Sequence, residues 1–391
     1  MPRIYHLLTE SEPFSEQNGG AVSRWTANVL CNHSDAKILA PASDDSWGFE
    51  PGRVGVLPGL IRYKRFIEKG GHLAPWSLRF HLLRKIIVPA LSGMQRGDTV
   101  WVHGRPEFAA ALEPIIHARG ARLFLHLHNS HLVQWSTVVT RAIHADQYVF
   151  SSHYIREEAL KKFPNLRGCS SVLGNGADQE LFYPSSVPRR PDAIPRVLFA
   201  GRLVPDKGLH VFLDAMRLIE ERGIALRGLV VGASAFGGSP PTPYVLEMQA
   251  SAPDSVRFEP YCAGVLMAEQ YRKADIYCLP SCWHDPFPLT VLEAMATGIP
   301  VVATESGGIP QQLAQGGGLM VQRNSAEELA DALAKLATDP ALRAEIGHQG
   351  LESFRANYTW ETIRLAYRQI LRRAPIQDKS AVAGRPVRSY A

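Results

Sequence analysis

Two acidic residues in the second half of the sequence have a spacing that suits a ligand with several hydroxyl groups. Asp285 lies in the proline-rich loop after the apolar segment 274–279, and Glu293 follows eight positions later in the expected helix 290–297. Ionised carboxylates only accept hydrogen bonds, so a pair of them favours hydroxyl-rich partners. The start of the helix adds free backbone N–H groups and the positive end of a helix dipole, which suit a phosphate.

The same residues also have a purely structural interpretation. Thr290 and Glu293 have the spacing of a capping box, in which the glutamate only completes the start of its helix. Asp285 stands directly before Pro286 and would then be a solvated turn residue. Residues elsewhere in the chain have to decide between the two interpretations.

Two cations near the start of the second half favour the ligand. Arg202 and Lys207 lie in the loop after the apolar segment 197–201, and their structural alternative is a surface salt bridge to Asp206. Arginine can hold two phosphate oxygens and lysine acts as a point charge, so together they would neutralise a diphosphate. Loops after parallel strands meet at one edge of the sheet, so these cations and the two acids are expected to share one site. The combination predicts a nucleotide sugar as the ligand.

Alternating apolar and polar segments predict the elements that position these residues. In the first half, strands are expected at residues 3–8, 37–40, 98–103, 121–127, 148–150 and 169–173, with helices at 21–30, 74–91, 106–119 and 152–162. In the second half, strands are expected at 197–201, 228–232, 256–258, 274–279, 299–303 and 318–321, with helices from about 209 and at 267–273, 290–297, 325–337, 340–356 and 360–373. Two successive series of this kind predict an α/β fold with parallel sheets covered on both faces and a ligand cleft between the halves.

The polar, proline-rich segment 185–195 indicates a linker between the two series. We therefore expect one domain over residues 1–187, a second over 188–357, a last amphipathic helix over 358–375 and a basic, disordered tail over 376–391.

Two residues of the first half are also candidates for ligand contact. Gly20 ends a polar loop before the expected helix 21–30, where a glycine lets the backbone approach a ligand closely, although a plain helix-entry turn also uses glycine. His128 follows the expected strand 121–127 and would meet a ligand there, although a lone histidine is more often structural.

Composition limits the class and the location of the protein. The chain has 391 residues, of which 46% are hydrophobic and 20% charged, as in ordinary globular proteins. Five scattered cysteines without a disulfide or zinc pattern predict a reducing cytoplasm. The first residues do not have the pattern of a signal peptide, and no run of 18 apolar residues predicts a transmembrane helix.

The positive charge is concentrated in residues 52–96. This segment contains nine lysines and arginines against one acid, Glu68, interleaved with aromatic and aliphatic residues. Such a mixture suits an anionic membrane surface, and its alternative is a solvated basic face on an ordinary helix. Because no nucleic-acid-binding motif accompanies the segment, nucleic acid is not an expected partner.

Several motifs, in order along nearly the whole chain, resemble one known family. Gly201–Gly208 resembles the family pattern G-R-L-x-x-x-K-G, and Gly174–Pro184 resembles P-N-G-V-D-x-x-x-F-x-P. Leu292–Thr304, with Gly307 and Gly308, resembles its most diagnostic block. The family comprises the retaining, GT-B-fold glycosyltransferases of family four, also called glycosyl transferases group 1. The resemblance implies two Rossmann-like domains facing across a cleft, an N-terminal domain for the acceptor and a C-terminal domain for the nucleotide sugar.

The resemblance also implies roles for individual residues. Asp285, at the position of the first acid of E-x7-E, would face the sugar ring, and His128 would lie near a distal hydroxyl of the transferred sugar. Glu293 would bind the ribose, and the last helix, Trp360–Arg373, would cross back to the first domain. The implied donor-binding residues are Gly20, Arg202, Lys207, Leu289, Thr290 and Glu293.

The implied reaction moves a hexose from a UDP- or GDP-linked sugar to a glycan or lipid-linked acceptor, with retention and without a metal or other cofactor. The implied setting is cell-envelope or exopolysaccharide synthesis at the inner face of the membrane. The sequence departs from the family at three positions, with Asp285 in place of glutamate and Pro288 and Pro260 where glycine is common. These departures affect the sugar specificity more than the reaction.

Three other functions compete with this one. A dinucleotide-dependent oxidoreductase needs G-x-G-x-x-G after its first strand, and neither Asn18–Gly20 nor Gly232–Gly237 has that pattern. A sugar phosphorylase on the same fold would share the motifs. An inactive paralogue that only binds a nucleotide sugar would explain Asp285 at the position of the first acid.

Overall fold

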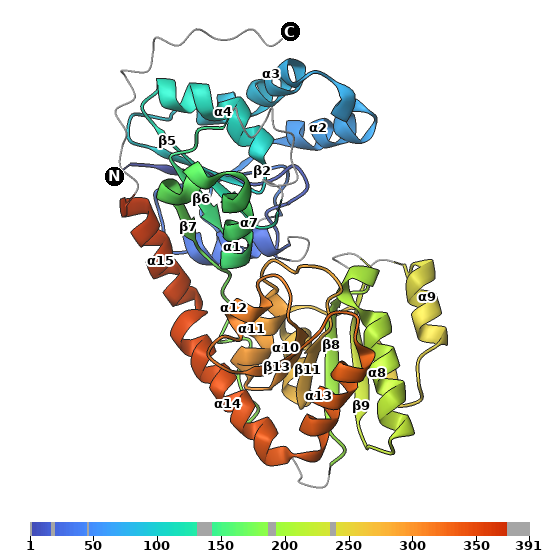
Figure 1. Cartoon of the computed structure of the whole chain (residues 1–391). Coiled ribbons are helices and arrows are strands. Elements are labelled where there is room, and N and C mark those ends of the chain that lie inside the picture. The colour runs from blue at the N-terminus through green and yellow to red at the C-terminus, as the bar shows by residue number, and fades with distance from the viewer. Residues whose placement is uncertain are drawn as a thin grey trace. The chain divides into compact units, whose positions relative to one another are not determined.

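The computed structural model describes residues 2–16, 20–44, 47–130, 143–186, 193–234 and 240–373, and Figure 1 shows the chain. The predicted tail 376–391 and the middle of the predicted linker 185–195 lie outside the described residues. The chain divides into two compact units: Met1–Leu173 joined by the segment from Arg364 onward, and Gly174–Ile363.

The first unit is built on a parallel sheet of seven strands in the order β3-β2-β1-β4-β5-β6-β7. The strands are β1 (Ile4–Leu7), β2 (Ala36–Ala40), β3 (Val54–Val56), β4 (Thr99–His103), β5 (Arg122–Leu127), β6 (Gln147–Phe150) and β7 (Ser170–Val172). The helices are α1 (Ala21–Leu30), α2 (Pro58–Glu68), α3 (Trp76–Ile87), α4 (Pro106–Ala118) and α7 (His153–Lys162), with 3₁₀ turns η1 (Gly71–Leu73), η2 (Val88–Leu91) and η3 (Pro164–Cys169). The sequence predicted most of these elements but missed β3 and α2.

The central strands of this sheet are buried on both faces, and the two faces differ in character. Side chains alternate along a strand, so every second residue faces the same layer. One face of β4 and β5 carries Val100, Val102, Leu123 and Leu125, which join the apolar core together with α4. The other face carries Trp101, His103, Phe124 and His126, each of them fully buried.

The second unit is built on a parallel sheet of six strands in the order β10-β9-β8-β11-β12-β13. The strands are β8 (Arg196–Arg202), β9 (Arg227–Ala233), β10 (Val256–Glu259), β11 (Ile276–Leu279), β12 (Val301–Thr304) and β13 (Gly318–Val321). The helices are α8 (Leu209–Glu221), α9 (Pro243–Ala250), α10 (Gly264–Lys273), α11 (Leu289–Thr297), α12 (Ile309–Gln312), α13 (Ala326–Thr338), α14 (Pro340–Asn357) and the start of α15 (Trp360–Arg373), with the 3₁₀ turn η4 (Pro205–Lys207). The sequence did not predict α9.

Two apolar cores cover the two faces of the second sheet. On β8, Val197 and Phe199 pack in one core with α8 and α13, whereas Leu198 and Ala200 pack in the other with α10 and α11. Helices therefore cover both faces of the sheet, as the alternating pattern of the sequence predicted (Figure 1). In both sheets the strand order reverses beside the first strand, which is the order of a Rossmann fold.

The segment after β7 belongs to the second unit, although the sequence predicted the domain boundary at residue 187. The Asn175 side chain donates to the Phe287 carbonyl at 3.0 Å, and the Ala177 N–H donates to the Tyr358 carbonyl at 3.1 Å. Helix α15 begins in the second unit, and its residues from Arg364 onward belong to the first.

Candidate functional site

The loops after β8 and β11 bring Lys207 and Asp285 together. Lys207 ends the turn η4, and its ammonium forms an ion pair with the Asp285 carboxylate. The two side chains are 14% and 6% exposed, so the pair is largely withdrawn from water. The Ser281 hydroxyl also donates to Asp285, at 3.4 Å. Because the strand order reverses between β8 and β11, this pair occupies the position where open α/β sheets bind ligands.

Two glycines allow these loops to meet. Gly208 and Gly307 have positive φ angles of 76° and 60°, which other residues adopt only with strain. A Cβ on Gly208 would lie 1.9 Å from the Pro280 carbonyl oxygen, and one on Gly307 would lie 2.1 Å from the carbonyl oxygen of Asp285. The Gly308 N–H donates to that same Asp285 oxygen at 2.8 Å. The backbone of the Asp285 loop is thus held by contacts that only glycine permits.

Glu293 lies on α11 and has a fixed partner in the core. Its carboxylate accepts a hydrogen bond from the Tyr271 hydroxyl at 3.0 Å, and the side chain of Glu293 is buried. Burial, and after it the Glu293 charge, raises the pKa of Tyr271 well above its ordinary value, so the hydroxyl keeps its proton and donates it. Pro288, not Thr290, is the N-cap of α11, so the capping box that competed with a ligand role does not form.

The two acids lie close enough to act on one neighbour. Burial, and with it the carboxylates of Glu293 and Asp285, raises the pKa of Tyr277 well above its ordinary value. Leu289 and Thr290 are the first two residues of α11, where backbone N–H groups have no partner inside the helix. The second unit therefore gathers Lys207, Asp285, Glu293 and a helix start around one end of its sheet.

Arg202 is the exposed member of the predicted set. It ends β8, and its guanidinium makes no hydrogen bond or ion pair with the residues that the structure describes. The predicted alternative, a salt bridge to Asp206, is therefore not formed within the described part of the chain. Arg202 ends the strand that precedes the turn of Lys207, and it can bind an anion without first breaking a contact with the described residues.

Gly20, the first predicted residue in the first unit, has a role inside the protein. It is the N-cap of α1, and the Glu12 carboxylate accepts the Ser23 N–H of the same helix at 2.9 Å. A Cβ on Gly20 would lie 3.0 Å from a Glu12 oxygen. The carboxylate of Glu12, which the sequence did not indicate, therefore lies at the start of α1, where the diphosphate was expected.

His128 is not the lone histidine that the sequence indicated. It follows β5, is half-buried, and its Nε2 lies 3.0 Å from Nδ1 of His103. The His126 ring centroid lies 4.0 Å from that of His128. Within the described residues, His103, His126 and His128 each offer one possible metal-ligand atom within 4.8 Å of the others. Both ring nitrogens of His103 form hydrogen bonds, to His6 and to His128, so one of these bonds would have to break for a metal to bind. Single-strand patterns could not reveal this cluster, because His103 lies on β4 whereas His126 and His128 lie on β5 and directly after it.

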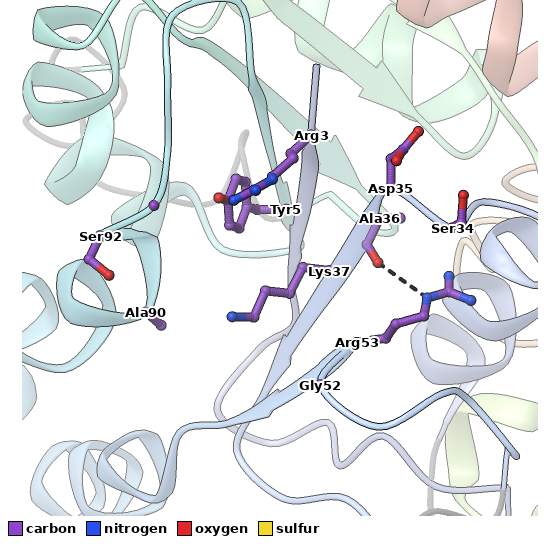
Figure 2. A pocket seen from close by; sticks show the side chains of 11 residues that line it. Arg3, Tyr5, Ser34, Asp35, Ala36, Lys37, Gly52, Arg53, Ala90 and Ser92 are labelled. Carbon is purple, nitrogen blue, oxygen red and sulfur yellow. Dashed lines mark hydrogen bonds between the residues drawn. The ribbon is translucent and has the colours of Figure 1, made fainter. Parts of the chain in front are cut away.

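Figure 2 shows a pocket of about 450 Å³ elsewhere in the first unit. Its lining includes Arg3 and Tyr5 at the start of β1, Lys37 at the start of β2, and Arg53 before β3. It therefore lies at the edge where the parallel strands begin, away from the edge where His128 follows β5. Arg53 donates to the Ala36 carbonyl at 3.4 Å, the contact drawn dashed in Figure 2.

The predicted basic segment is only partly a solvent-exposed face. Arg79 is buried, pairs with Glu107 and lies 3.9 Å above the ring of Trp76. Arg84 donates to the Ala111 carbonyl at 2.6 Å. These two cations therefore hold α3 against α4 and are not available to a membrane or another partner. Only the other, exposed cations of residues 52–96 can form the predicted basic surface.

Comparison with solved structures defines the class of the protein. The sucrose-phosphate synthase from Thermosynechococcus elongatus matches with a TM-score of 0.73 at 21% identity, over 95% of this chain and 98% of that chain. Anabaena HepE in complex with UDP matches with a TM-score of 0.72 at 19% identity, over 95% and 99%. The two Rossmann-ordered sheets and these likenesses define a GT-B fold of two Rossmann-like domains.

The second unit is similar to a known family. Residues 186–353 match the model for "Glycosyl transferases group 1", the family that the motifs of the sequence resemble. D-inositol 3-phosphate glycosyltransferase from Kribbella flavida is 34% identical over 214 residues, which are 50% of each chain. The enzyme of that name from Stackebrandtia nassauensis is 28% identical over 73% of this chain and 70% of its own length. The chain spans about half the length of the first curated relatives that it matches.

Proposed function

We propose that this protein is a retaining glycosyltransferase that moves a hexose from a nucleotide-diphosphate sugar to an acceptor hydroxyl. The observation that carries the proposal is the buried Lys207–Asp285 ion pair at the strand-order reversal of the second unit, with Glu293 nearby. A cation and two carboxylates in one place match a ligand that is both phosphorylated and rich in hydroxyls. In this proposal the second unit binds the donor and the first unit binds the acceptor, while Gly20 and His128 keep their predicted roles toward the diphosphate and the transferred sugar.

The donor diphosphate would be held by Arg202, Lys207 and the N–H groups of Leu289 and Thr290. Arg202 is exposed and can turn to phosphate oxygens, whereas Lys207 is already fixed by Asp285. Positive groups fixed before the reaction stabilise the charge that develops on the leaving diphosphate, so they can take the place of a metal ion. Glu293 would accept hydrogen bonds from ribose hydroxyls, and Asp285 would face the sugar ring.

The nucleotide and the acceptor follow from chemistry and from the relatives. Anabaena HepE is described in complex with UDP and with UDP-glucose, which favours UDP over GDP. The curated relatives are named D-inositol 3-phosphate glycosyltransferases, and we therefore add a cyclitol phosphate to the glycan and lipid-linked acceptors predicted from the sequence. We place the reaction in cell-envelope or exopolysaccharide synthesis.

A membrane surface is part of the proposal through α2, η1 and α3. Leu73 is 82% exposed, and Arg62, Arg65, Lys69 and Lys85 of the same segment are exposed. Among the helices that the structure describes, none has both the length and the hydropathy of a membrane span. Co-sedimentation with anionic vesicles, weakened by salt and absent with neutral vesicles, is the expected result.

One experiment tests the central proposal. UDP-glucose and GDP-mannose are each offered with inositol phosphate or a lipid-linked sugar acceptor, in the presence of excess chelator. The expected product carries the anomeric configuration of the donor, as read from its proton coupling by NMR. Transfer only from a sugar 1-phosphate, with release of inorganic phosphate, would instead identify a phosphorylase. Nucleotide-sugar binding without transfer or hydrolysis would identify an inactive paralogue.

A further inference from the structure

A chain of hydrogen bonds runs through the first unit from helix α15 to His128. The Tyr367 hydroxyl lies 2.9 Å from Nε2 of His6, and Nδ1 of His6 lies 3.0 Å from Nε2 of His103. His103 then lies 3.0 Å from His128, through its Nδ1 and the Nε2 of His128. Tyr367, His6 and His103 are fully buried, and His128 is half-buried at the end of β5.

Each inner histidine of this chain is neutral. Burial lowers the pKa of His6 to about 3, and burial lowers the pKa of His103 well below its ordinary value. A neutral imidazole has one N–H donor and one acceptor nitrogen, so its two hydrogen bonds must run in the same direction along the chain. The chain therefore has two consistent arrangements, one the reverse of the other.

The Tyr367 hydroxyl selects between these arrangements. If it donates to His6, each of the three contacts in the chain joins one N–H or O–H donor to one acceptor nitrogen, and the proton of the tyrosine hydroxyl has a partner. If it accepts from His6, its proton needs another acceptor, and the Tyr367 hydroxyl forms no second hydrogen bond with the described residues. His33 packs against the Tyr367 ring at 5.5 Å between centroids, but the buried His33 Nε2 has no hydrogen-bond partner within the described chain. A buried donor without a partner is unfavourable, so donation from Tyr367 is preferred.

We propose that Tyr367, His6 and His103 are positioning residues that fix the tautomer of His128. In the preferred arrangement His103 Nδ1–H donates to His128 Nε2, so the proton of neutral His128 is on Nδ1. The consequence of this tautomer rests on the proposed function. His128 would offer an N–H donor to a sugar hydroxyl and would not act as a base that removes the proton of that hydroxyl. Tautomer selection through the second ring nitrogen is a general way to orient a functional histidine.

The tautomer is measured on the full chain, labelled with ¹⁵N-histidine, by long-range proton–nitrogen NMR. The His128 signals are assigned by their loss in His128→Gln. Protonation of Nδ1 in His6, His103 and His128 is the expected result in the wild-type protein. A wild-type His128 protonated on Nε2 overturns the proposal, and this readout does not depend on whether sugar transfer is ever observed.

Two variants test the direction of control. Tyr367→Phe keeps the buried ring but removes the donor, so both arrangements leave one His6 nitrogen unmatched and His128 is expected to populate both tautomers. The matched control is Tyr148→Phe in the same unit, which loses a buried hydroxyl bonded to the Ile143 carbonyl at 3.0 Å but leaves the chain intact. An unchanged His128 spectrum in Tyr367→Phe, with folding verified by circular dichroism, contradicts the proposal.

Metal binding provides a further discrimination. A metal held by His103, His126 and His128 would need a ring nitrogen of His103, and both of these nitrogens belong to the chain, so it would break the hydrogen bond to His6 or the one to His128. Titration with zinc is expected to leave the tautomer pattern of His128 unchanged at stoichiometric metal. If His103, His126 and His128 shift together at one equivalent, the cluster is a metal site and the tautomer assignment is wrong.

Discussion

The candidate groups of the two units solve the problem of burying polar atoms in different ways. In the second unit, charged side chains from loops neutralise each other, as Lys207 and Asp285 do, and glycines hold the loops in contact. In the first unit, neutral imidazoles from strands form a directed chain that ends at His128. A buried charge is stable only while its oppositely charged partner is present. A chain of neutral imidazoles is stable only while each N–H group faces an acceptor nitrogen. The two units should therefore respond differently to substitution.

Lys207→Ala is expected to have the largest effect, because it removes the fixed positive charge of the proposed donor site. We expect kcat/KM for sugar transfer to fall roughly 10²–10³-fold, as for loss of one transition-state hydrogen-bond donor. The measurement is initial rate against donor concentration. The matched control is Lys273→Ala, which removes only a surface ion pair with Glu269 at 3.6 Å.

The Lys207 variant also leaves the buried Asp285 without its cation. Removal of one partner of a buried pair costs about 3–5 kcal/mol. The double variant Lys207→Ala/Asp285→Ala is therefore expected to be more stable than Lys207→Ala, while remaining inactive. Full activity in either variant would remove the charged pair from the proposed mechanism.

Glu293→Ala is expected to weaken donor binding, because it removes the carboxylate that would accept hydrogen bonds from the ribose. A hydrogen bond to a charged group contributes about 1.5–3 kcal/mol, so we expect the KM for the donor to rise roughly 10- to 100-fold. Glu293→Gln keeps an acceptor for Tyr271 and should fold as the wild type does. Equal KM values for a ribose and a 2′-deoxyribose donor in the wild type would argue against a ribose contact.

Gly307→Ala tests whether the Asp285 loop is held by close backbone contact. The added Cβ would overlap the Asp285 carbonyl, and the positive φ angle adds strain, so the free energy of unfolding should fall by about 2–4 kcal/mol. Gly264→Ala is the matched control, because Gly264 has a φ of 57° and no atom within 4 Å of the added Cβ. Equal losses in the two variants would mean that only the φ angle matters.

The smallest effect concerns pH and a histidine outside both candidate groups. Burial by itself lowers the pKa of His117, but hydrogen bonds to Asp146 and Glu113 outweigh burial and raise this pKa to about 9. Since the folded pKa lies above the unfolded value, its stabilisation is complete below about pH 6.5 and is lost as the pH rises toward 9. We expect urea unfolding to show a loss of about 2 kcal/mol over that range, at about 1.4 kcal/mol per pKa unit before discounting for solvent.

His117→Gln should flatten this pH dependence. His348→Gln should leave it unchanged, because the side chain of His348 is 67% exposed and its contact with Glu352 is on the surface. A wild-type protein equally stable at pH 6.5 and pH 9 would contradict the assigned pKa.

Most strands and helices could be predicted because their signals are local. Apolar segments bounded by glycine and proline marked the elements around the predicted site, such as β11 and α11, without any knowledge of packing. The misses have local causes as well. The short strand β3 has only three residues, and α9 begins at Pro243 within a Gly/Pro-rich segment that resembles a loop.

The candidate site was predictable to the extent that it depends on strand order. Lys207, Asp285 and Glu293 each follow a strand in the sequence, and parallel strands bring such residues to one edge. Their pairing was not predictable: the sequence assigned Lys207 to the diphosphate and Asp285 to the sugar, and the structure joins the two in an ion pair. The role of Tyr271 as the partner of Glu293 was missed, since a buried tyrosine in an apolar pattern has no signal of its own.

The sequence by itself determined the α/β class and the residues at the ends of the strands, and it indicated the family that residues 186–353 match, because these follow from short motifs and from the period of the apolar residues. Only the tertiary structure decided which of those residues contact each other. Tyr367 and His6 are separated by 361 positions along the chain. They meet with His103 because His6 and His103 lie on the same face of the neighbouring strands β1 and β4, and Tyr367 of α15 contacts His6. The direction of a hydrogen bond is set by the atoms that surround it, and those atoms come together only when the chain folds.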